Sequence, residues 1–436
     1  MPGKKSLCHR RVIKNCSSSH KLLAHTDLFN IGFFPLLITQ FISATADNAL
    51  LIVGIAMLVE VASAAWWIPI LKAVFIVSFI VFAPFVGIWA DMVPKKSVIF
   101  WANNLKALAC LSLLLGLHPF LSLALAGLGA ALYSPAKYGL VTEIVKRDLL
   151  VKANAWLEVS SVLAAILGAM AGGALVSTQF KAGSLALALN AYSPIASVYA
   201  PAVLVLLIAY LLATWWARFI PLSHAVYPHV HLKLNNAAPL FLLNFKKLWQ
   251  DSEGKISLSV TTLFWGTGAT LQIMILAWAQ EVLGLSLSEA TYLQVSAAIG
   301  MVLGAVIAAK TIPMDKARSF LKLGWLLGAL IMVMTVVHGL ITASVLMVAM
   351  GTLCGAFIVP MNALLQYRGK EMLSAGESIA VQNFSENTSV LVMVSIYSLL
   401  LALELPTQVL IFIYGLLIVI LMALIIRLNA RLPVKN

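Results

Sequence analysis

Four charged residues of this chain fall inside long stretches that are otherwise apolar. Asp47 is the only charged residue within residues 28–59, and Lys137, Glu158 and Glu386 occupy comparable places further along the sequence. An isolated carboxylate at membrane depth costs roughly 2.5–3.5 kcal/mol on insertion scales, so such a group is expected to be paired, to be protonated or to face a polar cavity. These residues are therefore the first candidates for a functional role.

The stretches that carry them must be membrane-spanning helices. The chain has 436 residues, of which 61% are hydrophobic and 10% charged, and its apolar stretches repeatedly reach the length of about 20 residues that crosses a bilayer. We therefore expect an all-α integral membrane protein. Twelve helical segments are predicted, with centres near Ser43, Ser78, Ala109, Ala130, Leu163, Ile208, Ala269, Gly300, Ala329, Thr352, Val390 and Ile418.

The net charge of +13 has a membrane explanation, because most of the 29 Lys and Arg residues lie in alternate loops. Positively charged loops stay in the cytoplasm, so both termini are predicted to be cytoplasmic. Membrane lipids, and not nucleic acid, are the expected partners of this charge. The basic segments are the N-terminal tail, residues 95–96, 146–152, 221–255, 310–322 and 368–370, and the C-terminus.

Two tails flank the spans. Residues 1–28 are basic and Ser-rich but lack the apolar core of a cleaved signal peptide, so they are expected to be a solvated cytoplasmic tail near anionic lipid. Residues 429–436 form the second tail. The four cysteines show no metal-type spacing. No disulfide, metal or cofactor is therefore expected.

Residues 221–255 separate the spans six and six, so we expect an N-terminal half over 29–220 and a C-terminal half over 256–428. Within this linker, PLFLLNFKKLWQ (239–250) is typical of an amphipathic helix on the inner membrane surface. Two six-helix halves that enclose a site near the bilayer midplane are a transporter architecture.

The halves also share a pattern. GAALYSP (129–135) is followed by Asn154 and Glu158, and GAFIVP (355–360) is followed by Asn383 and Glu386. This repeat predicts that the two glutamates occupy equivalent places. We expect Asn154 and Glu158 to tie their helix to neighbouring cytoplasmic loops, whereas Glu386 lies deeper in its span, where contact with a substrate and a structural role are both open.

The loop after the second span reads GIWADMVPKK over residues 87–96. Gly87 is expected to allow close helix packing, and Asp91 is expected to cap the N-terminus of the next helix. Lys95 and Lys96 supply positive charge on the inner side. These four residues are predicted to have a gating or structural role.

This loop resembles the cytoplasmic signature of the major facilitator superfamily, G-x-x-x-D-(R/K)-x-G-(R/K)-(R/K). It departs from that pattern at Met92 and at Pro94, where the superfamily prefers a basic residue and Gly. These departures put the gating role of the loop in doubt, whereas the twelve spans and their six-plus-six division agree with the superfamily.

Four stretches together are more specific: QFISATADNALL (40–51), FAPFVGIWAD (82–91), GAALYSPAKYG (129–139), and NALLQYRGK with IAVQNFSEN (362–387). With TLFWGTGATL (262–271), they resemble the bacterial lysophospholipid transporters of that superfamily. The resemblance covers about residues 35–428. It implies movement of lysophosphatidylethanolamine and lysophosphatidylglycerol from the outer to the inner leaflet of the inner membrane. It also implies that an acyl-carrier-protein-dependent acyltransferase then restores the second chain.

Such a substrate needs a polar pocket for its phosphate. Lys137 is the preferred phosphate ligand, since an ammonium serves as a point charge for phosphate. The alternative is that Lys137 extends to the inner headgroups. Tyr133 and Tyr138 are expected to add hydroxyl donors or to anchor the helix at the interface.

Asp47 and Asn48 are the next candidates. Asp47 is expected to pair with an ethanolamine ammonium or with a basic side chain during closure, and a purely structural contact is the alternative. Gln272 is also placed at the substrate site, because members of the family can carry Arg at the corresponding position. Its neutral side chain puts a charge pair between the halves in doubt. Lys106 is expected to extend its ammonium to the inner headgroups.

Two further functional classes were weighed. An exporter of drugs or amphipathic solutes, proton-coupled through Asp47, is compatible with an intramembrane carboxylate. An integral acyltransferase would need convergent acid and base groups, such as a His with an Asp five positions later, and the sequence has no such pair. We therefore expect a monomeric transporter and not an enzyme.

Overall fold

The computed structural model describes residues 32–60, 67–184, 186, 188, 197–223, 225, 227 and 234–431. The predicted tail 1–28 lies outside these residues. Eleven helices of the described part are long and apolar enough to cross a membrane, or twelve when one bent pair is counted as a single span. The predicted all-α membrane architecture is confirmed.

The N-terminal half holds six spans, of which the second is the bent pair. Its helices are α2 (Phe33–Glu60), α3 (Trp67–Val81) with α4 (Ala83–Met92), α5 (Lys95–Leu114), α6 (Pro119–Ile144), α7 (Leu150–Val176) and α10 (Ala200–Ala217). Short elements, η2 (Arg147–Leu149) and α8 (Thr178–Ala182), flank α7. The second span bends by 63° between α3 and α4. Pro84 in the first turn of α4 explains the break, because proline has no N–H to continue the ladder from α3.

The C-terminal half also holds six spans. They are α12 (Ser252–Glu281), α13 (Leu287–Thr311), η3 (Met314–Leu323) continued by α14 (Gly324–Val333) and η4 (Met334–Val336), α15 (Leu340–Met372), α16 (Ala375–Leu401) and α17 (Thr407–Ala430). Glycines let α13 and α15 pack very closely: a Cβ on Gly300 or Gly304 would collide with the backbone oxygens of Val348 or Thr352.

The linker between the halves contains α11 (Leu234–Gln250). The next span begins at Ser252, inside the segment assigned to the linker from sequence, because the Asp251 carboxylate caps it by accepting from the Gly254 N–H at 2.9 Å. Arg368 also donates two hydrogen bonds to Asp251. Partial burial raises the pKa of Asp251, but these bonds outweigh burial and hold the pKa below its ordinary value. The cap therefore stays charged at neutral pH.

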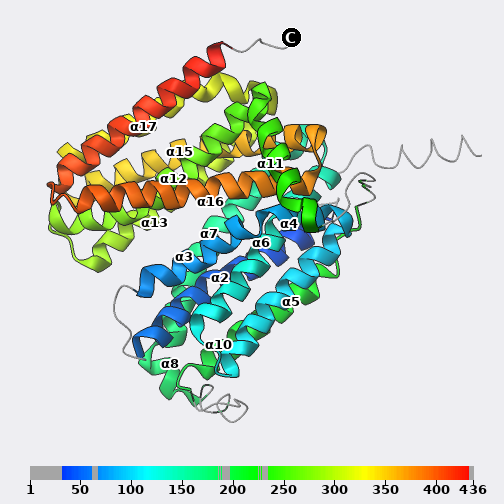
Figure 1. The fold of residues 1–436 in the computed structure, drawn as a ribbon. Coiled ribbons are helices and arrows are strands. Elements are labelled where there is room, and N and C mark those ends of the chain that lie inside the picture. The colour runs from blue at the N-terminus through cyan, green and yellow to red at the C-terminus, as the bar shows by residue number, and fades with distance from the viewer. Residues whose placement is uncertain are drawn as a thin grey trace, which may run out of the picture.

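The halves meet at one end of the bundle and diverge toward the other (Figure 1). We call the end that carries residues 93–94, 145–149, 218–223, 234–251, 312–323 and 373–374 the basic end. One hydrophobic core cluster contains residues of both halves. The second contains only N-terminal-half residues, such as Leu58, Leu113 and Tyr199, which lie away from the basic end. The two halves therefore share a core only toward the basic end.

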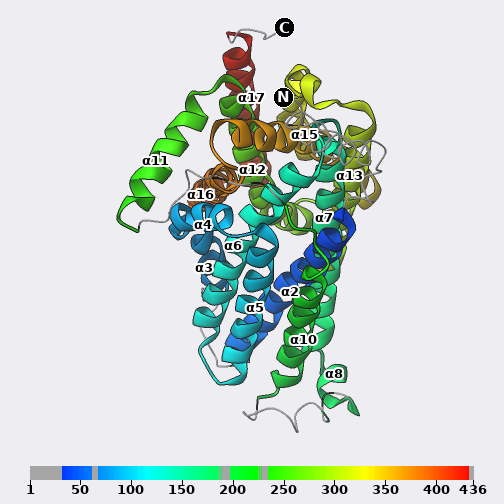
Figure 2. The ribbon, with the colours of Figure 1, turned by 90° about the vertical axis from the view of Figure 1, so that its right-hand side faces the viewer.

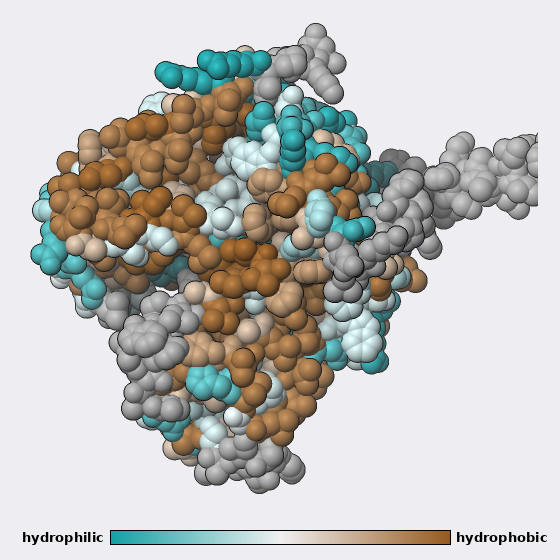
Figure 3. All heavy atoms as spheres, viewed as in Figure 1, coloured by the Kyte–Doolittle hydropathy of each residue, from teal (hydrophilic) through white to brown (hydrophobic). Residues whose placement is uncertain are grey.

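The outward faces of the helices are apolar. Large hydrophobic side chains are exposed along the spans of both halves, for example Leu163, Leu303 and Leu416. Figure 3 shows this hydrophobic surface over much of the visible face, with hydrophilic residues gathered toward the basic end. Exposed apolar surface on this scale suits contact with lipid chains.

Candidate functional site

A polar cavity lies between the two halves. It has a volume of about 400 Å³ and is lined by α2, α3, α5, α6 and α7 of the N-terminal half and by α12 and α16 of the C-terminal half. Of the predicted substrate residues, seven line this cavity: Asp47, Asn48, Tyr133, Lys137, Tyr138, Asn383 and Glu386. Residues from distant parts of the sequence thus meet in one space.

Asp47 has a partner that the sequence did not reveal. The Lys106 ammonium lies 2.7 Å from the Asp47 carboxylate and also donates to the Ser43 hydroxyl at 3.0 Å. The Tyr210 hydroxyl donates to the second carboxylate oxygen at 2.8 Å. An intramembrane carboxylate is stabilised by such pairing, so Asp47 is held as one half of an ion pair within the N-terminal half.

The expectation that Lys106 extends to the headgroups is therefore wrong. Its side chain is only 2% exposed and is directed from α5 toward α2. Gly129 on α6 makes room for the lysine stem, because a Cβ there would lie 2.7 Å from Lys106 Cγ. The Tyr133 ring also lies beside the ammonium, with its centroid 5.0 Å away. Position along the helix could not distinguish this inward rotamer from an extended one.

Lys137 differs from Lys106 in making no direct ion pair within the described residues, although the buried Glu158 carboxylate of α7 interacts with its charge. It lies on α6 directly after the helix-internal Pro135, is buried, and lines the cavity. Its ammonium lies 4.0 Å from the Tyr138 ring centroid. Among the described residues it makes no ion pair or hydrogen bond. A buried cation that makes no direct ion pair is a candidate anion site.

Asn48 and Tyr133, which line the same cavity, differ in whether their polar groups are free to bind a ligand. Asn48 uses its side-chain N–H to bond the Ala44 oxygen of its own helix at 2.8 Å. The Tyr133 hydroxyl is buried and makes no hydrogen bond with the part of the chain that is described. Because a buried hydroxyl is costly when it is unpaired, the Tyr133 hydroxyl is a second group beside Lys137 that could bind a ligand.

The two glutamates of the repeat are not equivalent in their surroundings. Glu386 lines the cavity and accepts from the Gln382 amide at 2.7 Å. Glu158 is buried in α7 and does not line the cavity. Within the described residues it makes no hydrogen bond or ion pair to a loop, because it lies two turns inside α7. The predicted tie between Glu158 and a loop is therefore absent.

Gln272 lies outside the cavity. Its side chain is exposed on α12, and its backbone oxygen accepts from the Gln294 amide at 2.9 Å. The structure therefore does not bring it to the predicted substrate site. Trp265 on the same helix does line the cavity, as do Ser161 and Asn387. Sequence reasoning missed these three, since polar or aromatic type alone does not show which face of a helix is inward.

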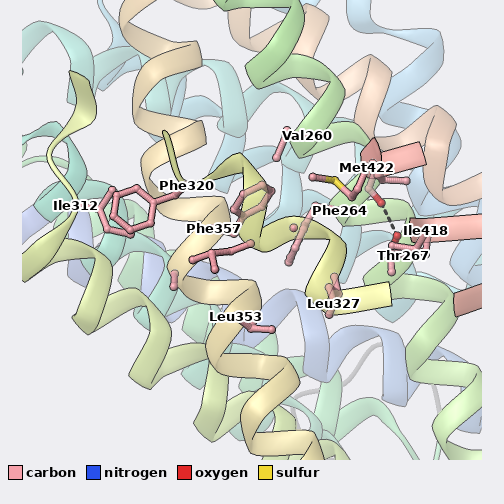
Figure 4. Close-up of a pocket in the computed structure, with 14 residues that line it drawn as sticks. Val260, Phe264, Thr267, Ile312, Phe320, Leu327, Leu353, Phe357, Ile418 and Met422 are labelled. Atoms are coloured by element: carbon pink, nitrogen blue, oxygen red, sulfur yellow. Dashed lines mark hydrogen bonds between the residues drawn. The ribbon is translucent and has the colours of Figure 1, made fainter. Parts of the chain in front are cut away.

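A second pocket lies inside the C-terminal half. Phe264, Phe357 and Met422 are among its walls, which come from α12, η3, α14, α15 and α17 (Figure 4). None of the residues found to line it is charged. A lining without charged groups does not suit an ionic headgroup, so this pocket is not the candidate site.

Asp91 joins the two halves at the basic end. Its carboxylate accepts from the backbone N–H groups of Gly376 at 2.9 Å and Glu377 at 3.0 Å, and from the Ser374 hydroxyl at 2.6 Å. The predicted helix cap is therefore real, but the capped helix is α16 of the opposite half and not the adjacent α5. A carboxylate is favourable at a helix N-terminus, so Asp91 holds the two halves together.

Lys95 joins this contact as a buried ion pair. Its ammonium lies 2.8 Å from Asp91 and 2.6 Å from Glu143. The Tyr227 hydroxyl donates to Glu143 at 2.8 Å. Burial, together with the neighbouring Glu143 carboxylate, raises the pKa of Tyr227 above its usual range. Lys96 instead donates to the backbone oxygen of Arg218 at 2.5 Å. The prediction that both lysines supply inside charge is thus too simple, since Lys95 is internal.

Gly87 allows α4 and α16 to approach. A Cβ added there would lie 2.8 Å from Ala380 Cβ and 2.9 Å from Glu377 Cα. Close packing at Gly87 was predicted, and the structure identifies the helix that it contacts.

We expect Gly87→Ala to loosen the basic end, because overpacking a tight contact costs about 1–3 kcal/mol. A cysteine at buried Ser378, in a background without other cysteines, should then react faster with a maleimide, and the melting temperature in detergent should fall. Gly173→Ala is the matched control, because a Cβ there meets nothing within 4 Å. Equal effects of both substitutions would contradict this account.

Two amide contacts relate the halves in a reciprocal way. Asn154 on α7 exchanges two hydrogen bonds with Gln366 on α15, at 2.9 and 2.8 Å. Asn383 on α16 exchanges hydrogen bonds with Ser134 on α6, the shorter at 2.9 Å. Asn154 and Asn383 occupy equivalent places in the repeat, on the fifth span of each half. Each of them bonds the fourth span of the other half.

The Asn154–Gln366 pair should behave as a unit in a double-mutant cycle. Each single alanine substitution leaves one buried amide unpaired, whereas the double variant removes both. We expect the double variant to melt no lower than the worse single variant. Asn104→Ala is the control, since that amide bonds only its own helix, at Phe100. Strictly additive losses would show that the two side chains are not coupled.

Comparisons with known proteins agree with this geometry. The sequence model of the Major Facilitator Superfamily matches residues 36–389. The chain is 39% identical over 383 residues to the lysophospholipid transporter LplT of Enterobacter sp. (strain 638), covering 88% of this chain and 92% of the relative. It is 38% identical over 391 residues to LplT of Escherichia coli (strain K12 / DH10B), covering 89% and 93%.

Solved structures share the fold at low identity. The transporter FucP, in its outward conformation, matches with a TM-score of 0.67 and 15% identity, covering 92% of this chain and 99% of FucP. The human organic anion transporter MFSD10 matches with a TM-score of 0.69 and 14% identity, covering 92% and 100%. At these identities the likeness concerns the arrangement of helices alone.

Proposed function

The chain belongs to the lysophospholipid transporter family of the major facilitator superfamily, and from this premise we propose that it moves lysophosphatidylethanolamine and lysophosphatidylglycerol across the bacterial inner membrane. It is a transporter and not an enzyme. The proposed direction is from the outer to the inner leaflet. The observation that carries the proposal is Lys137, a buried cation that makes no ion pair with the described residues and lines the cavity between the halves.

The phosphate is the group that both proposed substrates share, and Lys137 is its proposed ligand. Lys106 also lines the cavity, but its charge is already matched by Asp47. Lys137 is therefore the cation available to an anion, and the Tyr133 hydroxyl supplies a further donor beside it. The single acyl chain would lie against apolar lining residues such as Leu51, Phe79 and Val390.

The charge of the loops supports an orientation. Basic loops remain in the cytoplasm, so the basic end is proposed to be cytoplasmic, with both termini on that side. The contacts through Asp91, Asn154 and Asn383 then close the cytoplasmic end. The conformation described is accordingly one that accepts substrate from the outer leaflet.

The proposed mechanism is alternating access, which these contacts support. Release to the inner leaflet requires the Asp91 carboxylate to leave the N-terminus of α16 and the Asn154–Gln366 pair to separate. These bonds are confined to the basic end, so rocking of the halves would break them while bringing the opposite ends together. We propose that the chain works as a monomer, and that an acyl-carrier-protein-dependent acyltransferase consumes the product.

Reconstitution tests the proposal. Purified protein in liposomes should move fluorescent lysophosphatidylethanolamine and lysophosphatidylglycerol between leaflets faster than empty liposomes do. A diacyl phospholipid with the same headgroup serves as the comparison substrate. Transfer no faster than in empty liposomes would refute the proposal. The exporter alternative would instead require altered drug susceptibility in a deletion strain, and the pairing of Asp47 with Lys106 does not favour Asp47 as an isolated proton carrier.

A further inference from the structure

The two halves meet along two seams at the basic end, and within the residues that the structure describes a helix covers only one of them. At the first seam α4 packs on α16, and at the second α7 packs on α13 and α15. Helix α11 lies over the first seam, where the Phe241 and Phe245 rings contact Phe384 of α16 at 5.3 and 6.0 Å between centroids. Figure 2 shows α11 beside α4 and α16 on one side of the molecule, with α7 and α13 on the other.

The second seam carries a cationic pocket of about 250 Å³. In the described part of the chain no helix lies over this pocket as α11 lies over the first seam. Arg147 and Lys152 reach it from the N-terminal half, and Lys310 reaches it from the end of α13. Its acidic residues are Asp148 and Asp315. The pocket therefore has an excess of one positive charge at the level where α7 begins and α13 ends.

One of these charges is already shared between the halves. Arg147 lies 2.6 Å from Asp315 of the opposite half, with 52% and 74% of the two side chains exposed. Lys152 and Lys310 make no ion pair or hydrogen bond with the residues that the structure describes. Exposed pairs such as Arg147–Asp315 contribute little to stability, so an incoming anion can compete for the guanidinium.

We propose that this pocket binds the phosphate of an anionic phospholipid from the surrounding leaflet. Lys152 and Lys310 would hold the phosphate from opposite sides of the seam, and its acyl chains would continue along the exposed apolar face of α13, at Leu303, Val306 and Ile307. This continuity favours a lipid over free phosphate. Basic pockets between membrane helices on the cytoplasmic side suit such headgroups.

Binding there has a consequence for the seam. The lipid phosphate would compete with Asp315 for Arg147 and so weaken the contact between η2, which precedes α7, and η3, which follows α13. The uncovered seam is then the one that opens toward the inner leaflet, whereas α11 keeps the first seam covered. This step rests on the proposed function and orientation, but binding itself depends on neither.

Lipid retention tests the site on the full-length chain. Protein purified in mild detergent is titrated with phosphatidylglycerol, and bound lipid is counted by native mass spectrometry. The Lys152→Gln/Lys310→Gln variant should bind about tenfold more weakly than the wild type, since each lysine contributes to attraction of an anionic lipid. Lys246→Gln/Lys322→Gln is the matched control, because it removes two exposed lysines from the same end outside the pocket, and it should bind as the wild type does.

Each outcome has a defined meaning. Equal retention by the wild type and the pocket variant would overturn the site, and equal weakening in the control would show only a general surface charge. Displacement of the lipid by millimolar inorganic phosphate would overturn its assignment to lipid. Lysolipid transfer in phosphatidylcholine liposomes is measured separately, so failure of transport and failure of lipid binding are distinguishable.

Discussion

Replacement of Lys106 by methionine is expected to destabilise the protein and to abolish transport together. The substitution removes the only cation within bonding distance of Asp47 among the described residues and leaves a carboxylate uncompensated at membrane depth. Breaking a buried ion pair by removing one partner costs roughly 3–5 kcal/mol. The melting temperature in detergent and the initial rate of lysolipid transfer measure the two effects.

A substitution at Asp47, the partner of Lys106, is expected to restore the stability that Lys106→Met loses. Adding Asp47→Asn to Lys106→Met removes the orphaned charge, so the double variant should recover most of the lost melting temperature. Lys96→Met is the matched control on the same helix, because Lys96 only donates to a backbone oxygen at an exposed site. If Lys106→Met melts as the wild type does, or if Asp47→Asn fails to rescue it, the ion pair is not what holds α2 to α5.

Lys137→Ala is expected to lose transport of both lysophosphatidylethanolamine and lysophosphatidylglycerol but to retain the fold. Lys106→Met, in contrast, is expected to lose both stability and transport. Lys137 makes no ion pair with the described residues, so its removal breaks no direct salt bridge, although it takes a cation away from the neighbourhood of Glu158. Loss of a hydrogen bond to a charged group costs about 1.5–3 kcal/mol. This corresponds to a roughly tenfold to hundredfold loss of transfer rate at low substrate concentration.

Controls separate the charge from its surroundings. Tyr138→Phe retains the ring that lies 4.0 Å from the ammonium and should retain most transport. Lys246→Ala removes a cation from exposed α11 and should leave the transfer rate unchanged. Retained transport of both lysophosphatidylethanolamine and lysophosphatidylglycerol by Lys137→Ala would remove this lysine from the mechanism. Loss of only one would assign it to the headgroup and not to the phosphate.

Much of the fold was predictable because its signals are local. A span is a run of apolar residues of sufficient length, and its bends follow from residues such as Pro84. Because Lys and Arg are grouped in alternate loops, the loops that contain Arg147, Lys316 and Lys370 were predicted to lie on the same side of the membrane. The structure places these three residues at the same end of the helix bundle. The exceptions are also local: Asp251 begins α12 earlier than hydropathy alone indicates.

The candidate site was predictable in part. Rarity of charge at membrane depth was sufficient to select Asp47, Lys137 and Glu386, all of which line the cavity. The same criterion gave Lys106 the wrong environment, because a lysine two turns inside a span has either an extended or an inward rotamer. Gln272 was selected from a resemblance and lies outside the cavity, since one position on α12 can face the cavity while another faces away.

The sequence by itself determined the membrane class, the two six-helix halves and the residues too polar for their depth, because each depends on residue type and spacing along one helix. Only the tertiary structure decided the partners. Asp47 meets Lys106, Asp91 caps α16, and Lys137 makes no direct ion pair within the described residues. Pairing depends on how helices far apart in the chain are rotated and packed against one another, and a spacing along one helix does not encode that relation.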